Sequence, residues 1–140
     1  MAKYTLTTLG EDVYMAQALE PQSVSGTVTS SWFKMDKHQF AAFLVNVASG
    51  GGTVDVKVRQ ATDNAGTGAK DVTVASQASA GAGTIWVEFD EDQMDSTNGY
   101  QYVALEVTTG AATTLGAVFL GVGDAAPASS SHLVAHYALG

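Results

Sequence analysis

The stretch Val54-Asp55-Val56-Lys57-Val58-Arg59 alternates valine with charged side chains, and Asp71-Val72-Thr73-Val74 resumes the alternation after a polar connection. A period of two places the valines on one face of a strand and the polar side chains on the other. The connection itself contains Gly66 and Gly68, which permit a tight reversal of the chain. This region therefore predicts antiparallel β structure with one face of the sheet packed on a core.

The composition agrees with a single folded β domain. The chain has 140 residues, of which 46% are hydrophobic and 14% are charged, so it is long enough and apolar enough to bury a core. Valine, threonine, serine and glycine are plentiful, which suits short strands joined by turns. The absence of cysteine excludes disulfides, thiol catalysis and cysteine metal sites.

The charge balance indicates which partners to expect. Six basic residues stand against fourteen acidic ones, giving a formal net charge of −8. A nucleic-acid partner requires a basic surface to neutralise phosphates, and none is visible, so we expect no nucleic-acid binding. The same charge disfavours anionic membrane surfaces. The start of the sequence lacks the apolar core of a signal peptide, and no apolar run reaches membrane-spanning length. The absence of cysteine fits synthesis in a reducing cytoplasm.

Short strands recur along the sequence, with turn signals at 49–52, 98–99 and 109–110. The expected strands are residues 28–35, 40–48, 54–59, 71–75, 84–90, 100–108 and 115–122, with 132–139 as a last strand or an extended arm. Residues 77–83 are expected to form a flexible connection. Residues 1–27 are expected to form an arm on a neighbour, with a helical turn over 13–19 that Pro21 ends.

These elements predict an all-β fold. About eight strands with regular turns are typical of an antiparallel two-sheet β-sandwich of jelly-roll type, with an immunoglobulin-like sandwich as the alternative. No βαβ rhythm is present, so a parallel sheet is not expected. The corresponding domain division is an N-terminal arm over 1–27, a β-sandwich domain over 28–122, and a C-terminal strand or arm over 123–140.

The acidic side chains raise the possibility of a calcium site. Several carboxylates lie close together in the sequence, namely Glu88, Asp90, Glu91, Asp92 and Asp95. Calcium takes several oxygen ligands, but the spacing lacks the glutamate that closes an EF-hand loop. A solvated acidic turn is the favoured interpretation, and no metal site is predicted.

The histidines and serines give no catalytic pattern. His132 and His136 have the spacing of a zinc pair on a helix, but no glutamate follows the first, and on a strand they would lie too far apart. Residues 129–131 are serines near His132, yet no nucleophile-elbow pattern surrounds them. We therefore expect no catalytic residue and no cofactor, and predict that the protein is not an enzyme.

Four aromatic residues raise the possibility that the protein binds sugars or another protein. Trp32, Trp86, Tyr100 and Tyr102 could stack on sugar rings, as in carbohydrate-binding modules, or pack under loops and against a partner protein. Trp86 falls on the strand face opposite Ile85, so it is expected to be exposed or at an interface. Exposed aromatic residues mark protein contacts more often than sugar sites, and packing or protein contact is the favoured interpretation.

Several stretches resemble small virion structural proteins of tailed bacteriophages and prophages. The run Gln60–Lys70, read Gln-Ala-Thr-Asp followed by Gly-Thr-Gly-Ala-Lys, carries the resemblance most clearly. Residues 18–23 (Ala-Leu-Glu-Pro-Gln-Ser), 32–35 (Trp-Phe-Lys-Met) with 40–47, and 100–103 (Tyr-Gln-Tyr-Val) with 107–108 agree in the same order. The resemblance covers about residues 18–109 and consists of strand and turn patterns rather than catalytic signatures.

The resemblance implies a capsid decoration or cement protein. Such proteins sit on the outside of the shell, commonly as trimers over junctions between major capsid subunits, so the implied partners are the major capsid protein and further copies of the chain. The implied location is the capsid surface of a virion. The alternatives left open are a carbohydrate-binding β-sandwich module and a tail or head-completion component. Capsid or subunit contacts are hypothesised in the two terminal arms, at Tyr4, Leu6, Leu9, Val13, Tyr14, Met15, His132, Leu133, Val134 and Tyr137.

Overall fold

The computed structural model describes residues 13–36, 38–49, 51–72, 77–80 and 82–122, and these build an all-β antiparallel fold. The strands are β1 (Val13–Thr29), β2 (Phe33–Lys34), β3 (Phe40–Val47), β4 (Val54–Ala61), β5 (Lys70–Asp71), β6 (Gln77–Ala80), β7 (Gly83–Asp90) and β8 (Tyr102–Val122). Two short 3-10 helices, Glu91–Gln93 and Ser96–Asn98, connect β7 to β8. The all-β, antiparallel prediction is confirmed.

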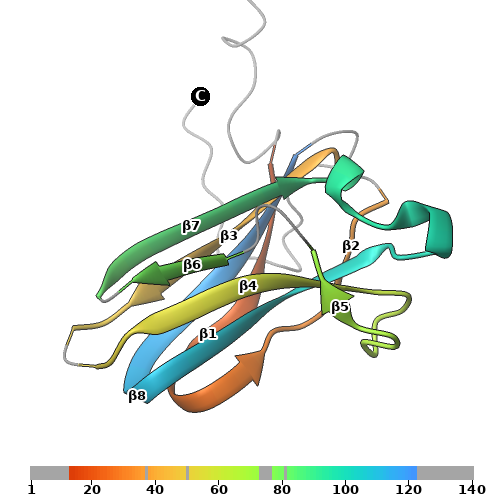
Figure 1. Cartoon of the computed structure of the whole chain (residues 1–140). Coiled ribbons are helices and arrows are strands. Elements are labelled where there is room, and N and C mark those ends of the chain that lie inside the picture. The colour runs from red at the N-terminus through yellow and green to blue at the C-terminus, as the bar shows by residue number, and fades with distance from the viewer. Residues whose placement is uncertain (1–12, 37, 50, 73–76, 81, 123–140) are drawn as a thin grey trace, which may run out of the picture.

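Strand β8 is the central strand of the sheet and pairs with β1, β2, β3 and β4. Its first part, from Tyr102 to Thr109, pairs with β4, and its second part, from Leu115 to Val122, pairs with β3. Strand β1 follows β8 on the other side from Val122 back to Glu106. The strand order is β5-β4-β8-β3-β7, and β1 and β8 bend together so that the sheet curls into a half-barrel (Figure 1). Because one hydrogen-bonded sheet contains all these strands, the expected division into two separate sheets is not confirmed.

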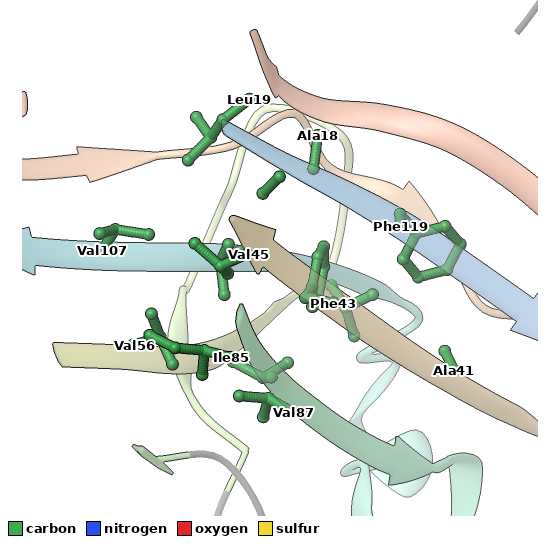
Figure 2. Close-up of a cluster of buried hydrophobic side chains, with 14 of the residues drawn as sticks. Ala18, Leu19, Ala41, Phe43, Val45, Val56, Ile85, Val87, Val107 and Phe119 are labelled. Atoms are coloured by element: carbon green, nitrogen blue, oxygen red, sulfur yellow. The ribbon is translucent and has the colours of Figure 1, made fainter. Parts of the chain in front are cut away.

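The core lies inside the curl. Figure 2 shows Val45, Val56, Ile85 and Val107, from four different strands, gathered in the space that the sheet encloses. The predicted alternation is confirmed: the inward valines of β4 are at most 1% exposed, whereas Asp55 between them is exposed. Aromatic rings fill the end of the core near the start of β3. There the fully buried Phe119 stacks on Phe33, with ring centroids 4.5 Å apart.

The expected helical turn over 13–19 is wrong, because these residues begin β1. They pair with β8 from Val13↔Val122 to Leu19↔Ala117, and residues 13–27 of the expected arm are thus part of the sheet. Pro21 lies inside the strand, at an irregularity in the register between Leu19 and Gln22. Proline is tolerated there because β1 pairs only with β8 among the described strands, and an edge strand does not need every N–H.

The expected turn at 109–110 is also wrong, because β8 runs through it without a break. Thr109 donates its hydroxyl hydrogen to the Val24 carbonyl (2.9 Å), and the Gly110 N–H donates to the Thr53 carbonyl (3.3 Å). These partners come from β1 and from the residue before β4. The chain therefore changes direction here by bending a continuous strand at an irregularity in its pairing with β1, rather than by a hairpin.

Three further elements have different bounds in the structure from those expected from the sequence. The strand expected over 28–35 is divided, because Ser30 leaves β1 and bonds Leu105 through both its N–H and its hydroxyl group. Residues 77–80 are strand β6, paired with β4, so the expected flexible connection is wrong there. Of the strand expected over 71–75, Asp71 belongs to β5 and Val72 lies after its end, and residues 73–76 lie outside the described residues. The turns at 49–52 and 98–99 are confirmed, the latter with Gly99 in the left-handed region at φ 82°.

Candidate interaction surface

The loop 62–69, which carries the clearest sequence resemblance, is organised by Asp63. Its carboxylate accepts hydrogen bonds from the Ala65 N–H (2.9 Å), the Thr67 N–H (3.0 Å) and the Thr67 hydroxyl (2.6 Å). The Thr67 hydroxyl is the largest of the influences that hold the pKa of Asp63 below its ordinary value. Gly66 adopts φ 84° beside the indole of Trp32, where a side chain would be strained and crowded.

An ion pair and hydrogen bonds connect the end of this loop to the residues around the second 3-10 helix. Lys70 forms a 2.5 Å ion pair with Asp95 and lies 4.3 Å from the centroid of the Tyr100 ring. The Tyr100 hydroxyl donates to the Gly68 carbonyl (3.0 Å), and the Asp95 N–H donates to the Gln60 side chain (2.8 Å). The side chains of Asp63, Thr67 and Lys70 are thus engaged in contacts within the fold. The loop is a structural element of the fold, and Tyr100 packs under it as expected.

The acidic residues do not assemble into a metal centre in the described part of the chain. No group of three or more His, Asp or Glu there is placed to hold an ion. Asp90 accepts a hydrogen bond from the Asp92 N–H and caps the first 3-10 helix, whereas Asp95 is paired with Lys70. Of the histidines, His38 is buried beside Tyr14 and Phe119. His132 and His136 lie outside the described residues, as do the three serines beside them. Among the described residues no helix is long and apolar enough to cross a membrane.

The most unusual surface is the outward side of the sheet formed by β7, β3, the second part of β8 and the first part of β1. Every second residue of these strands points outward, because the intervening ones face the core. The register aligns them in rows across the strands: Phe40, Val122 and Val13 in one row, Ala42, Leu120 and Met15 in the next, then Trp86, Leu44 and Val118. We call these nine side chains the outer apolar face.

The outer apolar face is open to solvent and slightly hollowed. Phe40 is 57% exposed, Trp86 53% and Val122 41%, and these are the large hydrophobic side chains that stand out on the described surface. A groove of about 310 Å³ lies between them, with Val13, Met15 and Leu120 in its lining. The prediction that Trp86 faces away from the core is confirmed. Contiguous exposed apolar side chains of this kind mark interaction sites in soluble proteins.

Among the described residues, the charges at this face are all negative. Glu88 stands in the row of Ala42 and Leu120, and Asp90 stands in the row of Phe40 and Val122, both on the β7 side. The cationic side chains that the structure describes are all engaged in salt bridges elsewhere: Lys34 with Asp36, Lys57 and Arg59 with Asp71 and Glu106, and Lys70 with Asp95. None of these four belongs to the rows of the outer apolar face.

The hypothesised contact residues fall into three groups. Val13 and Met15 lie on the outer apolar face. Tyr14 points to the other side, where its ring packs against Phe119 at 6.1 Å, and burial raises the pKa of its hydroxyl. The others lie outside the described residues, namely Tyr4, Leu6, Leu9, His132, Leu133, Val134 and Tyr137.

Sequence reasoning missed most of the outer apolar face. Phe40, Leu120 and Val122 were not among the expected contact residues, although all three lie in its rows. The signal was present in the sequence, because residues 40, 42 and 44 are as apolar as residues 41, 43 and 45. A strand that is apolar on both sides is normally buried on both faces by other parts of the protein or by a partner.

Comparison with known proteins gives distant structural similarities. No protein-family model matches the sequence, and no curated protein matches it. The prophage-derived protein YomS of SPBc2 is 13% identical, with a TM-score of 0.48 over 79% of this chain and 94% of YomS. A Bacillus endospore appendage protein is 10% identical, with a TM-score of 0.46 over 86% and 98%. A protein of the empty cowpea mosaic virus particle is 14% identical, with a TM-score of 0.45 over 80% and 87%. No function is transferred from similarities of this extent.

Proposed function

We propose that the protein is a structural component of a virion. It binds the outer surface of a tailed-phage capsid and stabilises contacts between major capsid subunits. The observation that carries the proposal is the outer apolar face, an exposed hydrophobic surface on the described β domain. The resemblance of residues 18–109 to small virion structural proteins supports the same function. The proposal assigns no catalytic activity, and places the protein on the capsid surface after synthesis in the host cytoplasm.

The energetics of the face suit binding to another protein. Complete burial of a large apolar side chain stabilises a complex by about 1.5–3 kcal/mol. Phe40 and Trp86 are 57% and 53% exposed, so covering what remains contributes roughly 1–1.5 kcal/mol for each. A trimer that presents three such faces to one junction multiplies the effect, because the second and third contacts form intramolecularly. We therefore propose that the protein acts as a homotrimer of the curled, jelly-roll-like domain.

Particle stability tests the proposal directly. We expect capsids that lack this protein to release their genome at lower temperature and to tolerate low salt less well. Adding back the purified wild-type protein should restore resistance. Particles with and without the protein that break down under the same conditions would contradict a cementing function. A cryo-EM map that places the protein on the tail or at the head–tail junction would replace capsid binding with a tail or head-completion role.

A carbohydrate-binding module is the second candidate, because Trp86 and Phe40 stand exposed beside a groove on a sheet face. Aromatic rings of this kind can stack on sugars. The groove is otherwise lined mainly by aliphatic side chains, whereas sugar hydroxyl groups need polar partners. Affinity electrophoresis and a glycan array with the wild-type protein and a Trp86→Ser variant distinguish the two. Glycan binding that the variant abolishes would favour the module, and no binding by either would remove it.

A further inference from the structure

We infer that the outer apolar face docks on a protein surface whose apolar centre is bordered, on the β7 side, by lysine or arginine side chains. This inference rests on the proposed function and specifies the patch of the major capsid subunit that the face would contact. It assigns the face to a different protein rather than to a second copy of this chain. Three observations carry it: the position of the carboxylates, the position of the cations, and the neutral opposite border.

The carboxylates stand on one border only. Glu88 is exposed on β7, and Asp90 ends the same strand in the row of Phe40. The chain continues from there into Glu91 and Asp92, both exposed. On the opposite border, β1 presents Val13, Met15 and Gln17. Among the described residues, the face is therefore an apolar strip with a negative side and a neutral side, which gives a partner a defined orientation.

The carboxylates on this border are not neutralised within the described residues. Glu88 and Asp90 appear in none of the salt bridges of the structure, whose acidic members are Asp36, Asp71, Asp95 and Glu106. Desolvating an unpaired carboxylate is costly, and a cation on the partner removes most of that cost. Complementary charge at a border also steers association and fixes orientation.

The described residues of a second copy do not supply that cation. In a two-fold contact between two outer apolar faces, Glu88 would meet either the partner's carboxylates or the neutral border formed by β1. No described lysine or arginine lies in any of the rows that form the face. The net charge of −8 on each copy adds repulsion. Self-association through this face would thus bury Glu88 and Asp90 without a cation from the described residues, whereas a basic partner would pair them.

The experiment measures binding of the full-length protein to shells assembled from the major capsid protein of the same phage, without other decoration. Co-sedimentation gives a Kd at low and at high salt for five proteins. These are wild type, the pair Phe40→Ser with Trp86→Ser, Glu88→Gln, Glu88→Lys, and Asp55→Lys as the matched control. Asp55 is exposed on β4, away from the face, so its lysine variant changes net charge as Glu88→Lys does. Thermal melting confirms that each variant is folded.

We expect the Phe40/Trp86 variant to bind at least 10-fold more weakly at both salt concentrations. Glu88→Lys should weaken low-salt binding several-fold and Glu88→Gln by a smaller factor, and both differences should shrink at high salt. Asp55→Lys should bind as wild type. The mass of the free protein by light scattering should be the same for wild type and the Phe40/Trp86 variant.

Other results overturn the inference in distinguishable ways. Shell binding by wild type that neither face variant weakens would overturn the inference and leave the proposed function standing. Tighter binding by Glu88→Lys would show an acidic partner border. A smaller solution mass for the Phe40/Trp86 variant would assign the face to a second copy. No binding of wild type to the shells would contradict the proposed function and the inference together.

Discussion

Replacing Gly121 with alanine tests the packing where the two ends of the described chain meet. A Cβ atom at Gly121 would lie 2.5 Å from Nδ1, 2.7 Å from Cε1 and 2.8 Å from Cγ of His38. Carbon atoms in contact normally lie about 3.5–4.0 Å apart, so the imidazole ring must move by roughly 1 Å. His38 is only 6% exposed and is held between Tyr14 and Phe119, whose centroids lie 5.3 and 5.7 Å from its own. The ring therefore has little room to move.

Overpacking of this kind costs about 1–3 kcal/mol. For a chain of this length we expect Gly121→Ala to lower the free energy of unfolding by about 2 kcal/mol and Tm by roughly 6 °C. Urea unfolding followed by tryptophan fluorescence measures the first quantity, and differential scanning calorimetry measures the second. In a His38→Ala background the added methyl group has space, so its cost should fall close to zero.

Gly110→Ala on the same strand is the matched control. The nearest atom to a Cβ at Gly110 is the Thr53 hydroxyl oxygen at 3.9 Å, an ordinary contact distance. Removing glycine flexibility from a strand without a clash should be neutral or stabilise by about 0.5 kcal/mol. If Gly121→Ala were as stable as wild type, or if its cost persisted after His38→Ala, the close approach of β8 to His38 would not be a property of the folded protein.

Two further perturbations test the core and the loop. Phe43→Ala removes a ring with 0% exposure and should cost about 3–5 kcal/mol, much of the stability of a domain; a loss below about 1 kcal/mol in urea unfolding would place Phe43 outside the core. The pKa of Asp95 is held below its ordinary value of 3.8, first by the hydrogen bond from Lys70, and the pKa of Asp63 is lowered by Thr67. Because the folded pKa lies below the unfolded one, this stabilisation is complete above the ordinary value and disappears as pH falls through the folded value. Asp95→Asn should therefore flatten the dependence of Tm on pH below about 4, and an unchanged acid limb would contradict the Lys70–Asp95 contribution.

Local patterns in the sequence predicted the parts of the fold that depend on local chemistry. The valine alternation over 54–58 correctly identified a strand with one buried face, because each step of a strand reverses the side-chain direction. Residues 62–69 form the predicted connection, since glycines at φ 84° and 67° allow the reversal. The hydrogen bonds between Asp63 and Thr67 and the ion pair between Lys70 and Asp95 could not be predicted, because sequence spacing does not show which side chains meet.

The long strands could not be predicted, because their continuity depends on partners far along the chain. Gly110 reads locally as a turn, yet strand β1 lies alongside β8 on both sides of that position and keeps it in the sheet. Pro21 reads locally as the end of a helix, yet it occupies an irregularity on an edge strand. In both cases pairing between residues about 90 apart outweighed a local preference, as is usual for β structure.

The outer apolar face has a direct cause in the sequence, because it is formed by the apolar residues that interrupt the alternation in β3 and β8. An antiparallel sheet with one solvated face should read as a clean alternation of apolar and polar residues, as β4 does. Over Phe40–Val45 and over Ala117–Val122 that alternation is missing, and the apolar side chains continue on the outward side. The core does not need them, because Phe43, Val45 and Phe119 already fill the inward side. Outward residues such as Phe40 and Trp86 lower solubility without adding to the core, so the protein gains from them only when something covers that face. The excess of apolar residues in these strands is therefore the sequence feature that agrees with the proposed binding of this face to another protein.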